Sequence, residues 1–264
     1  MNIFISSKQQ IVRKQVTEKR RETVFRLFSN GLIRTADKSQ LVQILEKLAP
    51  TSSFPTPCDR IVLDGAVLVH SAKPRVGIKN FQEYASQLSS HIEAVVLGAK
   101  TRRLDVGWDL YSSTSLKNTT RSRRGCRVRR QDFPRKVSCP KYYWKLHSSS
   151  LHGMSSRYMK EAGGRILLYV KDMVQQEYQR IIIHSSDADV VILAISFYNE
   201  LRACGLQELW LLFGFGNKRI CTCAHAMAQS LGQERSIALR GFHAFSGCDT
   251  VSSFGTKDKR TAWG

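Results

Sequence analysis

Aspartates recur in this sequence where apolar, strand-like runs end. The run at residues 180–186, RIIIHSS, stops at Asp187 and Asp189, and two earlier runs reach Asp64 and Asp109. Carboxylates that lie together repel one another unless a cation neutralises them, and hard divalent cations prefer oxygen ligands. We therefore expect these carboxylates to form a site for Mg²⁺ or Mn²⁺. Two-ion sites of this kind support hydrolysis of phosphodiesters.

The same aspartates also have a purely structural interpretation. Aspartate is favoured at helix N-caps and in turns. Asp189 would then cap the helix that follows it, and Asp187 would only turn the chain. The two interpretations differ in one prediction, because a metal site requires Asp64 and Asp187 to lie on the same side of the domain.

Alternating strand-like and helix-like runs must position these carboxylates. Runs of β-branched and other apolar residues predict strands at 60–71, 102–111, 180–183 and 208–216, and apolar residues at helical spacing predict helices at 78–97, 157–178, 190–201 and 223–232. The carboxyl ends of parallel strands share one edge of a sheet. We expect an α/β fold, a parallel twisted sheet flanked by helices, with an N-terminal helical extension.

Two finer expectations concern single side chains. In the helix at 78–97 a core-facing stripe is expected, formed by Phe81, Tyr84, Leu88, Ile92 and Val95. Asp105 lies in the middle of the predicted strand at 102–111 and is expected on its polar face.

The bulk properties point to a polyanionic partner. With 264 residues, of which 42% are hydrophobic, the chain can bury a core, yet its net charge is +20 and its pI is near 10. Such a charge favours nucleic acid as the partner. Seven cysteines without a repeating spacing do not suggest a disulfide framework, and no apolar run has membrane-spanning length or the form of a secretory signal. We expect no membrane partner and an intracellular protein.

A dense basic run occupies residues 117–136, with Asp132 as its one acid. Such runs contact phosphates or act as nuclear import signals, so we expect a nuclear rather than a cytoplasmic protein and DNA rather than RNA as its ligand. The alternative is a basic loop without a specific role. A further basic turn follows Asp249. The candidate nucleic-acid contacts are Lys117, Arg121, Arg123, Arg124, Arg127, Arg129, Arg130, Lys257 and Lys259.

Composition divides the chain into three parts. Residues 1–50 form a basic helical extension with a short amphipathic helix before Pro50, and residues 51–59 form a Ser- and Pro-rich linker. Residues 60–264 form the folded domain, with a basic insertion at 112–136 and a shortened loop at 137–156.

Five phrases in order, LDG, WD, EAGGR, SSDAD and GCDTVSSFG, resemble the PIN-like nucleases of the flap endonuclease and XPG type, and also a multi-copy group of animal proteins that carries the same phrases. The resemblance covers residues 60–263. It implies a parallel sheet between helices, a divalent-metal site and cleavage of branched or single-stranded DNA or RNA. By position, the metal-site and catalytic carboxylates would be Asp64, Asp109, Glu161, Asp187, Asp189 and Asp249. Residues 117–130 would match the family's basic helical gateway, and residues 255–259 its segment that holds duplex backbone.

The sequence also departs from this family. Gly163 stands where the family has a second carboxylate after the glutamate, Lys160 stands where it has an acid, and no apolar strand precedes Glu161. A shortened, partly eroded copy would hold one metal ion instead of two and cleave weakly or not at all. The alternatives are a nucleic-acid-binding protein that keeps the fold, and a truncated product without a settled function.

Overall fold

The computed structural model describes residues 28–29, 32–33, 37–49, 57–101, 103–108, 162–214, 219–248 and 258–263. Two compact units divide the chain, one made of residues 1–41 and 241–264 and the other of residues 42–240. Of the predicted site residues, Asp109, Glu161, Asp249, Lys257 and the candidates between 117 and 130 lie outside the described ranges.

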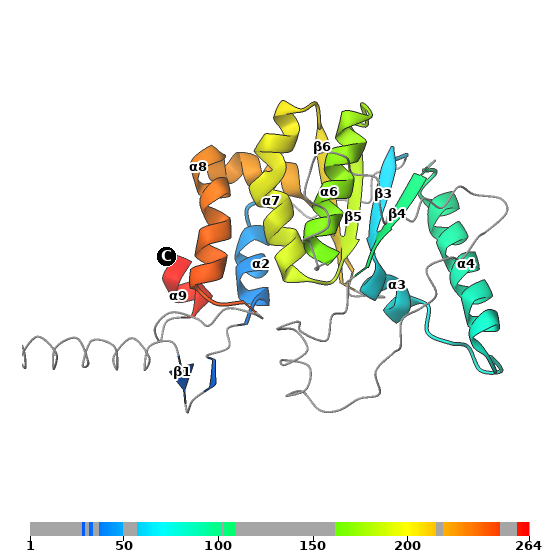
Figure 1. Ribbon diagram of the computed structural model, residues 1–264. Helices are drawn as coiled ribbons and strands as arrows, with labels where there is room; N and C mark the ends of the chain where they lie inside the picture. The colour runs from blue at the N-terminus through cyan, green and yellow to red at the C-terminus, as the bar shows by residue number, and fades with distance from the viewer. Residues whose placement is uncertain are drawn as a thin grey trace, which may run out of the picture. The chain divides into compact units, whose positions relative to one another are not determined.

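The larger unit is built on a five-stranded sheet (Figure 1). Its order is β4 (Arg103–Gly107), β3 (Arg60–Asp64), β5 (Arg180–Ser185), β6 (Glu208–Phe213) and β7 (Ile220–Cys223). The first four strands are parallel, and β7 is antiparallel to β6. The isoleucines at 181–183 of the central strand are at most 1% exposed, as expected for a strand covered on both faces. The α/β fold is therefore confirmed, with one unexpected antiparallel edge strand. The strand predicted at 60–71 is wrong beyond Asp64, because residues 65–71 form a helix that Asp64 caps.

Helices cover this sheet. They are α3 (Gly65–Ser71), α4 (Phe81–Gly98), α6 (Ala162–Gln175), α7 (Ala188–Ala203) and α8 (Ala224–Phe245). The α6 helix packs on β3, β4 and α7, and α7 packs on β6. Gly232 has a φ of 77° and kinks α8, whose last residues belong to the smaller unit. None of the described helices is long and apolar enough to cross a membrane.

The remaining described elements are short. The smaller unit contains β1 (Phe28–Ser29), which pairs antiparallel with β2 (Leu32–Ile33), and α9 (Lys259–Trp263). The α2 helix (Ser39–Glu46) matches the amphipathic helix expected before Pro50.

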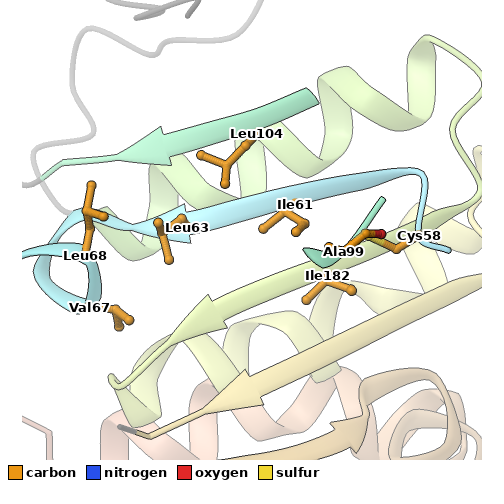
Figure 2. Packing of buried hydrophobic residues seen from close by; sticks show 8 residues of the cluster. All are labelled: Cys58, Ile61, Leu63, Val67, Leu68, Ala99, Leu104 and Ile182. Carbon is orange, nitrogen blue, oxygen red and sulfur yellow. The ribbon is translucent and has the colours of Figure 1, made fainter. Parts of the chain in front are cut away.

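Part of α4 packs on an apolar cluster. Figure 2 shows the eight buried residues of this cluster. Ile61, Leu63 and Leu104 of the strands belong to it, and Leu88 and Ile92 of the helix pack against it. Each fully buried aliphatic side chain contributes about 1.5–3 kcal/mol to folding. The cluster therefore holds α4 on the sheet.

Phe81 is the exception to the expected stripe. Its side chain is 82% exposed, whereas Tyr84, one turn later, is 8% exposed. Phe81 is the first residue of α4, after the Asn80 cap, so it precedes the part of the helix that covers the core.

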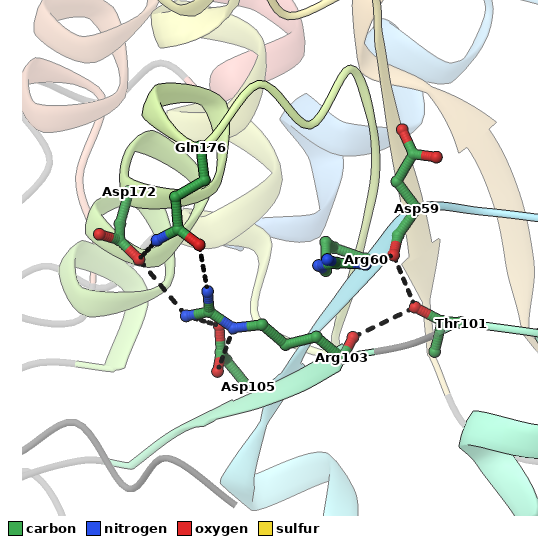
Figure 3. Close-up of polar contacts among 7 residues, drawn as sticks. All are labelled: Asp59, Arg60, Thr101, Arg103, Asp105, Asp172 and Gln176. Atoms are coloured by element: carbon green, nitrogen blue, oxygen red, sulfur yellow. Dashed lines mark hydrogen bonds and ion pairs between the residues drawn. The ribbon is translucent and has the colours of Figure 1, made fainter. Parts of the chain in front are cut away.

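Asp105 also differs from expectation (Figure 3). It is 3% exposed, and its Oδ2 lies 2.8 Å from Nη2 of Arg103. Arg103 also pairs with Asp172 of α6 at 3.3 Å and donates to Oε1 of Gln176 at 2.9 Å. Burial by itself would lower the pKa of Arg103, but the hydrogen bonds and charges of Asp105 and Asp172 outweigh it and raise that pKa. Asp105 is therefore buried within a network of ion pairs between β4 and α6, and it does not lie on an exposed polar face of the strand.

Candidate carboxylate site

Asp64 ends β3 at the carboxyl edge of the sheet. It is also the N-cap of α3, because its Oδ1 accepts a hydrogen bond from the backbone N of Ala66 at 2.9 Å. The side chain is only 5% exposed. Burying a charged carboxylate costs free energy unless it accepts hydrogen bonds, so the partners of Asp64 determine that cost.

Ser185 supplies the second partner of this carboxylate. It ends β5, the strand beside β3, and its Oγ donates to Oδ2 of Asp64 at 2.8 Å. The same Oγ accepts from the backbone N of Asp187 at 3.1 Å. One buried hydroxyl therefore joins the carboxylate at the end of β3 to the turn that follows β5. Ser185 was not among the expected site residues, and the only sequence signal for it is a small hydroxyl residue at the end of a buried strand, just before an aspartate.

Asp187 begins the next helix. Its Oδ1 accepts from the backbone N of Asp189 at 3.1 Å, which makes Asp187 the N-cap of α7. Asp189 lies half-buried in the first turn of that helix. The capping role belongs to Asp187 and not, as the structural interpretation expected, to Asp189. Capping and a shared sheet edge coexist here, since Asp64 and Asp187 are linked through Ser185.

The described residues do not by themselves form a multi-ligand metal centre. Within the described ranges, no group of three or more Asp, Glu, His or Cys side chains is arranged to hold a metal ion. The contacts join the Asp64 carboxylate to the Ser185 hydroxyl, and they join that hydroxyl to the backbone N of Asp187 and not to its carboxylate. The side chains of Asp64, Ser185 and Asp187 carry hard oxygen atoms, which suit Mg²⁺ or Mn²⁺ better than a metal that prefers thiolate ligands.

Gly163 has a packing role in this structure. A Cβ placed on it would lie 3.3 Å from Cγ2 of Val190 and 3.8 Å from Cδ1 of Leu193. Val190 directly follows Asp189, so position 163 lies against the first turn of α7. The glycine lets α6 and α7 approach closely, and a larger side chain at this position would have to displace Val190.

Lys259 does not have the exposure expected of a phosphate contact. Within the smaller unit its side chain is 0% exposed, and its Nζ donates to Oγ of Ser246 at 2.7 Å and to the carbonyl of His243 at 3.3 Å. The ammonium group ties α9 to the end of α8. We therefore leave Lys259 out of the proposed nucleic-acid contacts.

Neither a scan against models of known protein families nor a search of curated proteins finds a match to this chain. The resemblance to PIN-like nucleases therefore stays a prediction that rests on the order of five short phrases.

Proposed function

We propose that this protein is a nucleic-acid-directed phosphodiesterase of the PIN-like type, dependent on Mg²⁺ or Mn²⁺ and of low activity. The observation that carries the proposal is the link from Asp64 through Ser185 to Asp187 at the carboxyl edge of a parallel sheet, which is where open α/β folds bind ligands. Asp109, Glu161, Asp189 and Asp249 are proposed to complete the ligand set.

The uneven charge distribution supports a polyanionic substrate. The described residues contain 17 Lys and Arg against 15 Asp and Glu, so they contribute +2 of the net charge of +20. The other 24 Lys and Arg are accompanied by only 6 Asp and Glu. The positive charge is therefore concentrated in the segments outside the described ranges, such as 117–136. We propose that these segments contact phosphates, preferably of DNA, and direct the protein to the nucleus.

The chain's own residues would each have a defined task. Asp64 and Asp187 would hold the cation, and Ser185 keeps the Asp64 carboxylate turned toward the Asp187 turn. A bound divalent ion would supply Lewis-acid activation of water and neutralise charge on the leaving oxygen. The basic segments would raise the local concentration of the phosphodiester substrate.

Asparagine substitutions test the proposal, because asparagine keeps an N-cap but removes the carboxylate charge. Purified protein is incubated with flap, hairpin and single-stranded DNA and RNA in Mg²⁺, Mn²⁺ or EDTA. We expect slow, metal-dependent cleavage that Asp64→Asn and Asp187→Asn each abolish. Asp258→Asn is the matched control, since Asp258 accepts from the backbone N of Thr261 in the first turn of α9. Cleavage that persists in EDTA, or that survives Asp64→Asn, would contradict the proposal.

A second candidate is a nucleic-acid-binding protein without catalysis. The tight packing of Gly163 against Val190 favours it, because a carboxylate at that position would require Val190 to shift. Fluorescence anisotropy with labelled DNA in EDTA would then show binding that weakens with salt. In a plot of the logarithm of the affinity against the logarithm of the salt concentration, the slope should be about −0.9 for each neutralised phosphate. Replacing Arg123, Arg124, Arg129 and Arg130 by alanine should reduce that slope, while no cleavage appears in any metal.

A further inference from the structure

We propose that Trp108 is a positioning residue for Asp64. Its indole lies directly against Gly65, the first residue of α3. A Cβ added to Gly65 would lie 2.3 Å from Cε3 and 2.5 Å from Cδ2 of the indole, far inside van der Waals contact. Gly65 does not have a positive φ, so the glycine is required here for space and not for backbone conformation. The ring covers the backbone immediately after the Asp64 carboxylate.

Two contacts hold the backbone at and before Trp108, and a third holds the ring. Gly107, the last residue of β4, lies so close to α6 that a Cβ on it would come within 2.9 Å of Cγ1 of Ile166. Nη1 of Arg165 donates to the carbonyl of Trp108 at 3.3 Å. The indole is partly buried and packs against the apolar cluster that contains Leu63. Trp108 is therefore held by β4, by α6 and by the core, so it can act as a fixed wall.

The indole affects the orientation of the Asp64 carboxylate through the first turn of α3. Gly65 lies between Asp64 and Ala66, and the Oδ1–N hydrogen bond of 2.9 Å joins these two residues across it. If the ring is removed, the turn gains space and the hydrogen bond between the Ala66 amide and Oδ1 of Asp64 opens more often. Asp64 then samples more orientations. The effect on metal binding rests on the proposed function, whereas the effect on the turn does not.

The test compares two tryptophans of the same cluster in the full chain. Trp108→Leu removes the wall, and Trp210→Leu is the matched control, because Trp210 is also partly buried against this cluster but lies in β6. Amide hydrogen exchange is followed by NMR at Ala66, relative to Ile182 in the central strand, and Mn²⁺ affinity is measured by calorimetry. We expect exchange at Ala66 to rise at least tenfold and Mn²⁺ affinity to fall at least tenfold in Trp108→Leu, with changes below threefold in Trp210→Leu.

Equal relative exchange at Ala66 in the two variants would overturn the inference, whatever happens to overall stability. If the unaltered protein binds no Mn²⁺, the metal site of the proposed function fails, and the exchange data still decide the role of Trp108. Gly65→Ala provides an independent route, because its methyl group must push the ring away. It should also raise exchange at Ala66, and Gly65→Ala combined with Trp108→Leu should add nothing to the effect of Trp108→Leu. If the two substitutions instead have additive effects on exchange at Ala66, the proposed role of the Trp108 ring is contradicted.

Discussion

His184 should make the folded protein sensitive to acid. It lies in β5 with its side chain 8% exposed, and burial is the main cause that lowers its pKa to about 4. The carbonyl of Gly214 partly opposes this shift by accepting a hydrogen bond, and the charges of Arg219 and His91 add to it. Within the described part of the chain, Nε2 of His184 has no hydrogen-bond partner, so nothing there would stabilise a second proton.

The sign and size of the effect follow from proton linkage. The unfolded chain takes up this proton near pH 6.5 and the folded protein only near pH 4, so the unfolded state holds more protons between these values. The free energy of unfolding therefore falls as the pH drops below 6.5. From the difference between the two pKa values, the free energy of unfolding falls by about 3 kcal/mol in total as the pH is lowered. About 1.5 kcal/mol of this is already lost at pH 5.5.

Urea unfolding at pH 7.5 and pH 5.5 would measure this contribution. His184→Leu removes the titrating group, so the variant should lose about 1.5 kcal/mol less than the unaltered protein between the two pH values. Any pH-independent cost of the substitution cancels in this difference. His70→Gln, at an exposed position of α3, is the control and should keep the full acid sensitivity. An unchanged pH dependence in His184→Leu would refute the assignment of the acid sensitivity to buried His184.

Four further substitutions test contacts of the sheet domain and of α8, each by urea unfolding at pH 7.5. Ser185→Ala removes one hydrogen bond to the buried Asp64 carboxylate and should cost about 1.5–3 kcal/mol, whereas a loss below about 0.5 kcal/mol would mean that the hydrogen bond is not maintained. A methyl group at Gly241 would meet open space, so Gly241→Ala should raise the free energy of unfolding by up to about 1 kcal/mol through helix propensity. Gly163→Ala should raise it less or lower it, because α7 lies against position 163. Equal gains in the two variants would rule out the tight helix contact. Arg103→Met removes an ion pair of the buried Asp105 and should cost about 3–5 kcal/mol, and a cost near zero would show that this pair does not contribute to stability.

The sequence by itself determined the elements that carry the candidate site. Side-chain preferences act over a few residues, so the isoleucine run before Asp187 predicts a strand and the apolar periodicity after it predicts a helix. Parallel strands place their carboxyl ends at one edge, and this brought Asp64 to the same edge as Asp187. The structure confirms this much of the fold.

The tertiary structure decided which side chains meet at that edge. Ser185 binds a carboxylate 121 residues earlier in the chain, and no local pattern distinguishes its hydroxyl from any other serine at the end of a strand. The burial of Asp105 depends in the same way on Arg103 being held by α6, and the exposure of Phe81 depends on where α4 meets the sheet. From the sequence, Gly163 was expected to mark a lost ligand, yet Gly163 and Gly65 each make room for a neighbour distant in sequence. Close packing depends on which surfaces of the protein meet. Local sequence patterns do not show which surfaces those are, and the folded structure does.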